Sequence, residues 1–244
     1  MKPTLVEEIR SRYGQILEKI DMVSGSVGRQ PGSVRLVVVT KTHPLESVLA
    51  ALEAGVRDLG ENYAEEAAAK ISAIGAIHDL AWHMIGHVQS RKAELVVQNF
   101  DFVHSIDSFK LASRLDRFAS EVGRTLPVLL ECNVSGEESK FGFPVYEKPL
   151  INSFLTEAEK IAQLSHLDIR GLMTMPPLYD DPEKTRPYFQ RLSELRSVCI
   201  KQIPKTCWQE LSMGTSADFP AAVEEGATII RVGTAIMGPR PLKA

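Results

Sequence analysis

A lysine stands directly after an apolar segment of the sequence. Lys41 follows residues 34–40, an almost unbroken apolar run that contains three consecutive valines. Short β-branched runs of this kind are typical of strands that are buried on both faces. A lysine rooted at such a strand end is partly desolvated, which lowers its pKa and frees the amine for Schiff-base chemistry. Alternatively, its long stem extends to the rim and the amine stays solvated. Position alone favours neither interpretation.

Two loops near the end of the chain have residue types that bind anions. Gly214, Thr215 and Ser216 precede a predicted helix, and Gly233 and Thr234 follow the last apolar run. Backbone N–H groups at a helix start, together with two hydroxyl groups, form a neutral cradle for an anion such as phosphate. The same residue types also cap helices and form turns, and the two roles are compatible. No lysine follows the glycines, so neither loop is a P-loop.

An arginine lies inside the last apolar segment. Arg231 is flanked by Ile230 and Val232, and an unpaired charge buried in such a strand is costly. An acceptor is therefore expected. A ligand ring nitrogen or a ligand carboxylate would serve, and so would a structural ion pair with Glu131 or Glu210.

The elements that position these residues alternate regularly. Eight short apolar segments are predicted to be strands, at 34–40, 57–60, 81–85, 102–106, 127–134, 169–173, 208–213 and 228–232. Amphipathic segments between them are predicted to be helices, at 45–54, 63–74, 91–98, 108–122, 145–164, 183–201 and 217–225. Strict alternation of this kind predicts an α/β fold with a parallel sheet and right-handed crossovers.

Eight such units are the number that closes a TIM-type barrel. We therefore expect a single (β/α)8 barrel domain over residues 1–244, with an extra N-terminal helix, within residues 1–30, packed on the barrel. A doubly wound open sheet is the alternative, because periodicity does not show closure. In such barrels the active site lies at the C-terminal ends of the strands, which is where Lys41, Asn62, His83 and Arg231 fall.

Composition excludes several classes of protein. The 244 residues carry a net charge of −3 with 44% hydrophobic and 24% charged residues, which is ordinary for a globular chain. No basic stripe indicates nucleic-acid binding, and no segment is apolar enough to predict a membrane span. Three cysteines and no signal peptide favour a cytoplasmic protein. His83 and His87 are four residues apart but span a strand end, so we expect no metal site.

Seven ordered blocks of sequence resemble those of the pyridoxal 5′-phosphate (PLP) homeostasis proteins, which are single-domain relatives of alanine racemase. The blocks run from the first predicted strand to the last, at 39–44, 60–63, 82–86, 133–140, 170–175, 211–219 and 231–236. Departures from the family pattern are small: Thr215 replaces an expected methionine, and Val88 and Arg91 replace a more usual leucine and asparagine.

The resemblance implies a PLP protein of fold type III, in which Lys41 carries the cofactor as a covalent aldimine. It further implies that the phosphate is held in the loops of the last two strands and that Arg231 faces the pyridine nitrogen. Asn62 is implied near the edge of the cofactor, and His83 in its wider surroundings. The cofactor-binding residues expected in the two phosphate loops are Gly214, Ser216, Gly233 and Thr234.

The resemblance also implies storage, buffering or delivery of PLP rather than catalysis. An arginine against the ring nitrogen makes the ring a weak electron sink, and the second domain that supplies the opposing acid in alanine racemases is not expected here. We therefore predict a monomer or weak dimer without catalytic residues, with PLP-dependent apo-enzymes as possible partners. The alternatives are a slow amino-acid racemase or other PLP enzyme, a barrel aldolase that forms a Schiff base with a phosphorylated sugar, and a purely structural binding role.

Overall fold

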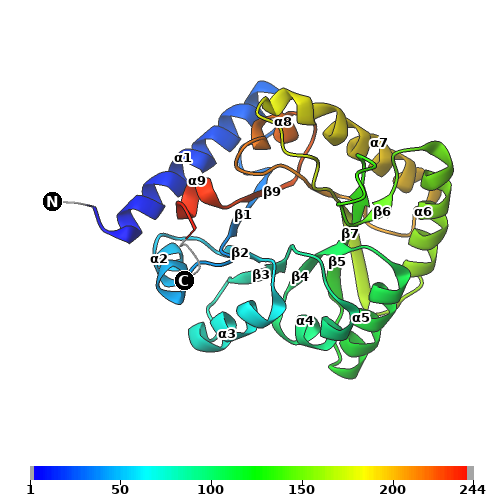
Figure 1. Ribbon diagram of the computed structural model, residues 1–244, viewed down its shortest axis with the longest axis horizontal. Coiled ribbons are helices and arrows are strands. Elements are labelled where there is room, and N and C mark those ends of the chain that lie inside the picture. Colours follow the sequence, from blue (N-terminus) through cyan, green and yellow to red (C-terminus); the bar gives the residue numbers. More distant parts are fainter. Residues whose placement is uncertain (1–2, 241–244) are drawn as a thin grey trace.

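The computed structural model describes residues 3–240, in which a ring of parallel strands is surrounded by helices (Figure 1). The strands are β1 (Arg35–Val39), β2 (Asp58–Glu61), β3 (Ala81–Met84), β4 (Phe102–Ile106), β5 (Leu126–Asn133), β6 (Phe143–Pro144), β7 (Leu167–Met173), β8 (Glu210–Ser212) and β9 (Ile229–Val232). The helices are α1 (Leu5–Ser26), α2 (Leu45–Glu53), α3 (Ala64–Ile74), α4 (Ala93–Asn99), α5 (Phe109–Glu121), α6 (Lys148–Ile161), α7 (Arg186–Gln202), α8 (Phe219–Glu224) and α9 (Thr234–Met237). Two short 3₁₀ turns, η1 (Ser90–Lys92) and η2 (Pro182–Thr185), precede α4 and α7.

The sheet is closed. Its strand order is β4-β3-β2-β1-β9-β8-β7-β5, and β4 also pairs with β5, so eight parallel strands complete the ring. The two-residue strand β6 pairs only with the end of β5 and stands outside the ring. The predicted (β/α)8 barrel is therefore confirmed, and the open doubly wound sheet is excluded.

The apolar side chains of the strands form two layers. Val37, Phe102, Leu129, Met173 and Ile229 form a cluster of their own, while side chains on the other face of the strands, together with the helices, form the larger outer core. This explains why the strand segments are apolar throughout, since both faces are buried. Burial of one such large side chain stabilises the fold by roughly 1.5–3 kcal/mol.

Some predicted boundaries differ from those of the structure. The helix expected at 145–164 is shorter (Lys148–Ile161), because the preceding residues, Phe143 and Pro144, pair with β5 and Pro149 lies at the helix start. The last helix expected before β9, at 217–225, begins only at Phe219, since residues 216–218 form a turn. Periodicity finds an element, whereas local caps and turns decide where it ends.

The N-terminal helix packs on the outside of the ring, beside α2, α8 and α9. Thr4 caps α1: its hydroxyl accepts from the Glu7 N–H, and the Glu7 carboxylate accepts from the Thr4 N–H. Ile9 and Ile20 of α1 are buried against the barrel layer. Within residues 3–240, no helix combines the length and the apolar character that crossing a membrane requires.

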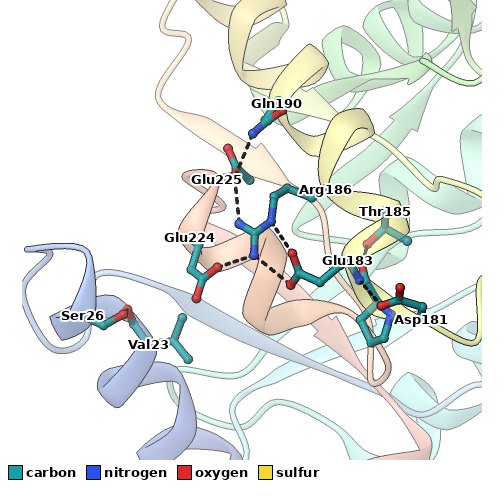
Figure 2. A network of polar contacts seen from close by, with 10 residues as sticks. Val23, Ser26, Asp181, Glu183, Thr185, Arg186, Gln190, Glu224 and Glu225 are labelled. Carbon is teal, nitrogen blue, oxygen red and sulfur yellow. Dashed lines mark hydrogen bonds and ion pairs between the residues drawn. The ribbon is translucent and has the colours of Figure 1, made fainter.

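An ion network ties the start of α7 to the end of α8. The Arg186 guanidinium donates to carboxylates of Glu183, Glu224 and Glu225, and Gln190 also donates to Glu225 (Figure 2). These side chains lie on the outer surface of the barrel, among the helices rather than at the strand ends.

Candidate functional site

A cavity of about 490 Å³ opens at the C-terminal ends of the barrel strands. This volume lies in the range that is typical of small-molecule sites. Six of the eight residues predicted to bind a ligand line it: Lys41, Asn62, Ser216, Arg231, Gly233 and Thr234. The strand ends therefore bring together a lysine, an arginine, an amide and two hydroxyl groups that are far apart in the sequence.

Lys41 follows β1 and is half-buried. Burial is the main cause that lowers the pKa of its amine, and the positive charges of Arg240 and Arg231 lower it further, while Glu61 opposes the shift. A lowered pKa increases the fraction of neutral amine, which is the nucleophilic form. The structure thus favours the desolvated lysine over the solvated one.

A charged cluster, which the sequence analysis does not predict, holds the backbone on both sides of Lys41. Lys70 of α3 donates to the Thr40 carbonyl at 2.8 Å, to Glu61 at 2.7 Å and to Glu66 at 2.7 Å. Glu66 also accepts from the N–H of Thr42, a residue held at a positive φ of 63°. The sequence signal is the spacing of Glu66 and Lys70, four residues apart on one helix face.

The two late loops are tied to each other and to the barrel. The Gly233 N–H donates to the Ser216 hydroxyl oxygen at 3.2 Å, so the two loops meet at the cavity wall. Thr215 turns its hydroxyl to Asp218, at 2.9 Å, rather than to a neighbouring loop. The helical turn after Gly233 and the turn that precedes α8 begin here, and N–H groups at a helix start lack partners within the helix.

Gly214 shapes its loop instead of lining the cavity. It adopts a φ of +93°, and a Cβ atom there would lie 2.6 Å from the Cβ of Ala222. Its carbonyl accepts the N–H of Arg231 at 3.0 Å. The predicted ligand role of Gly214 is therefore indirect in this geometry, because only glycine allows the loop to pass so close to α8.

Arg231 of β9 is buried and points into the barrel mouth. One guanidinium nitrogen donates to the Ser212 hydroxyl, and the other donates to the Thr174 carbonyl at 2.9 Å. Neither acceptor is charged, so the expected ion pair with Glu131 or Glu210 is absent from the described residues. Burial lowers the pKa of Arg231 to about 10, which leaves the guanidinium charged at neutral pH.

A chain of buried hydrogen bonds continues from Arg231 through the barrel. Ser212 meets His104 at 2.9 Å, His104 meets His83 at 3.0 Å, and His83 meets Asp58 at 2.9 Å. The Asp58 carboxylate only accepts, so His83 donates to it from Nε2. When both imidazoles are neutral, His83 Nδ1 accepts from His104 Nε2, and His104 Nδ1 accepts the Ser212 hydroxyl proton.

The structure does not bring His83 to the cavity. Its neighbours in β3, Trp82 and Met84, pack in the outer core, and the His83 ring lies inside the barrel, where it bonds to Asp58 at the start of β2. The ring is therefore directed away from the strand ends. A sequence pattern that is apolar on both faces gives no indication of which side chains point inward.

Two buried polar atoms of the cavity lining have no hydrogen-bond partner among residues 3–240. They are Asn62 Oδ1 and Glu131 Oε2. Buried polar atoms are normally satisfied, so two such exceptions on residues of one cavity wall are consistent with a ligand site there. Together with a nucleophilic amine, a guanidinium and two hydroxyl-bearing loops, they fit a small aldehyde with an anionic group.

The chain has the fold of the alanine racemase N-terminal domain. The family model described as "Alanine racemase, N-terminal domain" matches residues 14–241. An alanine racemase of Clostridium difficile superposes with a TM-score of 0.67 at 15% identity, over 97% of this chain and 58% of that chain, and at this identity the likeness concerns the fold alone. By its fold, the chain therefore belongs to the class of proteins built on the alanine racemase N-terminal barrel.

More similar relatives define the family within that class. Pyridoxal phosphate homeostasis proteins of Vibrio alginolyticus and Escherichia coli are 39% and 34% identical, each over 96% of this chain and 98–99% of the relative. PipY of Synechococcus elongatus, described with PLP bound, is 36% identical with a TM-score of 0.82, covering 94% of this chain and all of that one. The chain belongs to the pyridoxal phosphate homeostasis protein family.

Proposed function

We propose that this chain binds PLP reversibly through the Lys41 amine and so takes part in storage, buffering or delivery of the cofactor. The observation that carries the proposal is the half-buried Lys41 amine of lowered pKa, which lines one cavity with Arg231 and the two late loops. The names of the relatives support the same role, as does the description of PipY with PLP bound.

Lys41 has the chemistry that reversible attachment requires. Its neutral amine adds to the aldehyde carbon, a carbon–nitrogen double bond forms, and the aldehyde oxygen leaves as water. Addition of water reverses the step and releases the ligand, with no oxidant or reductant consumed. When bound, PLP supplies an electron-withdrawing pyridine ring. The Lys70, Glu61 and Glu66 cluster holds the loop so that the amine stays at the cavity wall.

The remaining groups match the rest of the ligand. In this proposal Ser216 and Thr234 offer hydroxyl groups to the phosphate, and Arg231 faces the ring nitrogen. Because a guanidinium only donates, it disfavours a proton on that nitrogen and leaves the ring a weak electron sink. This feature favours a carrier over a racemase.

Reductive trapping tests the attachment. We expect purified protein with PLP to show a visible absorption band, and borohydride followed by peptide mapping to place the adduct on Lys41. Lys41→Ala should abolish both. Lys140→Ala is the matched control, since Lys140 also lines the cavity, and it should keep the Lys41 adduct. An adduct on another residue, or none, would contradict the proposal.

The phosphate assignment has its own test. Ser216→Ala or Thr234→Ala should weaken PLP binding by roughly 1–3 kcal/mol, since each removes a hydrogen bond to a charged group. Binding of pyridoxal, which lacks the phosphate, is the control and should change much less. Equal losses for both ligands would show that the two hydroxyl groups act on something other than the phosphate.

A further inference from the structure

Glu131 is a buried carboxyl group that the proposed attachment does not use. It lies on β5, across the ring from β1, and lines the same cavity as Lys41. The residue is 7% exposed, and its Oε2 atom has no partner among residues 3–240. A buried carboxyl group with an unpartnered oxygen is uncommon, and this one belongs to a residue that lines the cavity, where a bound ligand would lie.

The surroundings of Glu131 favour its protonated form. Burial is the main cause that raises its pKa to about 7, the negative charge of Asp107 after β4 raises it further, and Arg231 lowers it. The basic side chains nearby have other partners: His87 pairs with Asp107 at 2.9 Å, and Lys140 donates to the Pro176 carbonyl at 3.4 Å. Lys41, on the far side of the ring, is itself partly desolvated.

The strands that pair with β5 place uncharged residues beside Glu131. On β7, Met173 lies in register with Glu131, and on β4, Ile106 lies in register with the neighbouring Leu130. The short strand β6 meets the neighbouring Cys132 with Phe143. Near neutral pH the carboxyl group therefore changes between a hydrogen-bond donor and an anion that only accepts.

This inference rests on the proposed function. Of the four polar groups of PLP, the phosphate, the aldehyde and the ring nitrogen already have counterparts in the cavity. The ring oxygen beside the aldehyde remains, and Asn62 and Glu131 are the lining residues with unpartnered oxygens that have not yet been assigned to a part of the ligand. We propose that Glu131 is a further ligand-contacting side chain, which donates a hydrogen bond to this ring oxygen when protonated and opposes ligand binding when ionised.

The test compares wild type with Glu131→Gln, whose amide is a neutral donor at every pH. PLP dissociation constants are measured from pH 6 to pH 9 for both proteins. Contributions from Lys41 and from the ligand phosphate are common to both and cancel in the ratio. We expect the ratio of the wild-type to the variant constant to rise about tenfold over this range, which corresponds to one unit of ligand-linked pKa change.

Asn62→Ala is the matched control, because Asn62 presents the second unsatisfied atom of the cavity but does not titrate. It should weaken binding by a factor that is constant with pH. With 3-O-methyl-PLP, whose ring oxygen carries no charge, the rise of the Glu131→Gln ratio should vanish. A flat ratio with PLP itself would overturn the role of Glu131, whereas wild type that binds no PLP at any pH would overturn the proposed function.

A measurement on the wild-type protein keeps the inference testable if the variant folds poorly. The protonated Glu131 carboxyl group is identified by infrared spectroscopy of protein labelled with ¹³C-glutamate. We expect PLP to move its titration midpoint to higher pH. A midpoint that stays in place or falls on PLP addition would show that the carboxyl group does not donate to the ligand.

Discussion

Two arginines organise polar networks in this barrel, and they do so in opposite ways. Arg186, on the outer surface, has a side chain 26% exposed and is surrounded by three carboxylates (Figure 2). Arg231, in the barrel mouth, is 3% exposed and is held by a serine hydroxyl and a backbone carbonyl. The exposed charge is neutralised by charge, whereas the buried charge is held by neutral dipoles.

The difference shows what each network is suited to do. Carboxylates accept from all three guanidinium nitrogens of Arg186, so this side chain links α7 to α8 on the outer surface and does not face the cavity. A chain of hydrogen bonds links Arg231 through Ser212, His104 and His83 to Asp58. The carboxylate at the end of this chain does not contact the guanidinium itself. Its positive charge therefore stays available at the cavity wall, where the proposed ligand has negative groups.

The largest effect should come from the middle of the buried chain. His104→Leu keeps much of the volume but leaves His83 Nδ1 and the proton of the Ser212 hydroxyl without partners. Two unsatisfied buried groups should lower the free energy of unfolding by about 2–6 kcal/mol, measured by urea denaturation of the apo-protein. His78→Leu is the control, since the His78 side chain is 93% exposed and its loss should cost little.

An equal effect of both histidine substitutions would remove the distinction between the buried chain and the surface. A small effect of His104→Leu alone would mean that the barrel interior relaxes or admits water around the orphaned groups.

Much of this contrast could not be predicted from the sequence. Alternation of strands and helices places strand ends at one rim, and Lys41, Ser216, Thr234 and Arg231 line one cavity there. The Ser212 hydroxyl, which accepts from Arg231, is not among the acceptors that the sequence suggests. Ordinary serines give no signal of this kind, since their role depends on which side chains point inward and meet across the ring.

The same limit applies to charged residues beside the rim. Glu61, Glu66 and Lys70 lie in and after the second strand, yet only the folded barrel shows that they hold the backbone next to Lys41. Glu131 was named as an ion-pair partner for Arg231. The structure leaves one of its oxygens unsatisfied instead, because the two side chains line the cavity without meeting.

A smaller effect tests whether the chain positions Arg231 for a ligand. Ser212→Ala separates Arg231 from His104 while the contact with the Thr174 carbonyl remains. We expect PLP binding to weaken by about 1–3 kcal/mol, with a shift in the absorption maximum of the bound ligand. Ser212→Thr, which keeps a hydroxyl group, should restore the maximum. A stability loss without any change in binding or spectrum would restrict the chain to a structural role.

The pH dependence of stability should separate the two networks. Burial lowers the pKa of His104 well below its usual 6.5, so its contribution to stability is present above pH 6.5 and is lost as the pH falls through its lower folded value. The loss approaches about 1.4 kcal/mol per pH unit. The destabilisation caused by His104→Leu should therefore shrink in acid, as measured by urea denaturation at pH 5 and pH 7.5. A difference that stays constant would mean that His104 is not buried in its neutral form.

The smallest effect should come from Arg186. Hydrogen bonds to Arg186 lower the pKa of Glu183 below its usual 4.5, so this network keeps its contribution throughout pH 5–7.5. Arg186→Met retains the apolar stem and removes the charge, and should lower the free energy of unfolding by about 1 kcal/mol, since partly exposed ion pairs gain little in high dielectric.

Salt tests the same network. Because salt screens exposed charges, the loss of stability caused by Arg186→Met should be smaller in 1 M NaCl, whereas the loss caused by His104→Leu should not change. PLP affinity should be unchanged, since Arg186 joins α7 to the end of α8 on the outer surface and the cavity lies at the strand ends. A large, salt-independent loss would show that Arg186, like Arg231, is effectively buried, and the contrast between the two arginines would then rest on their partners alone.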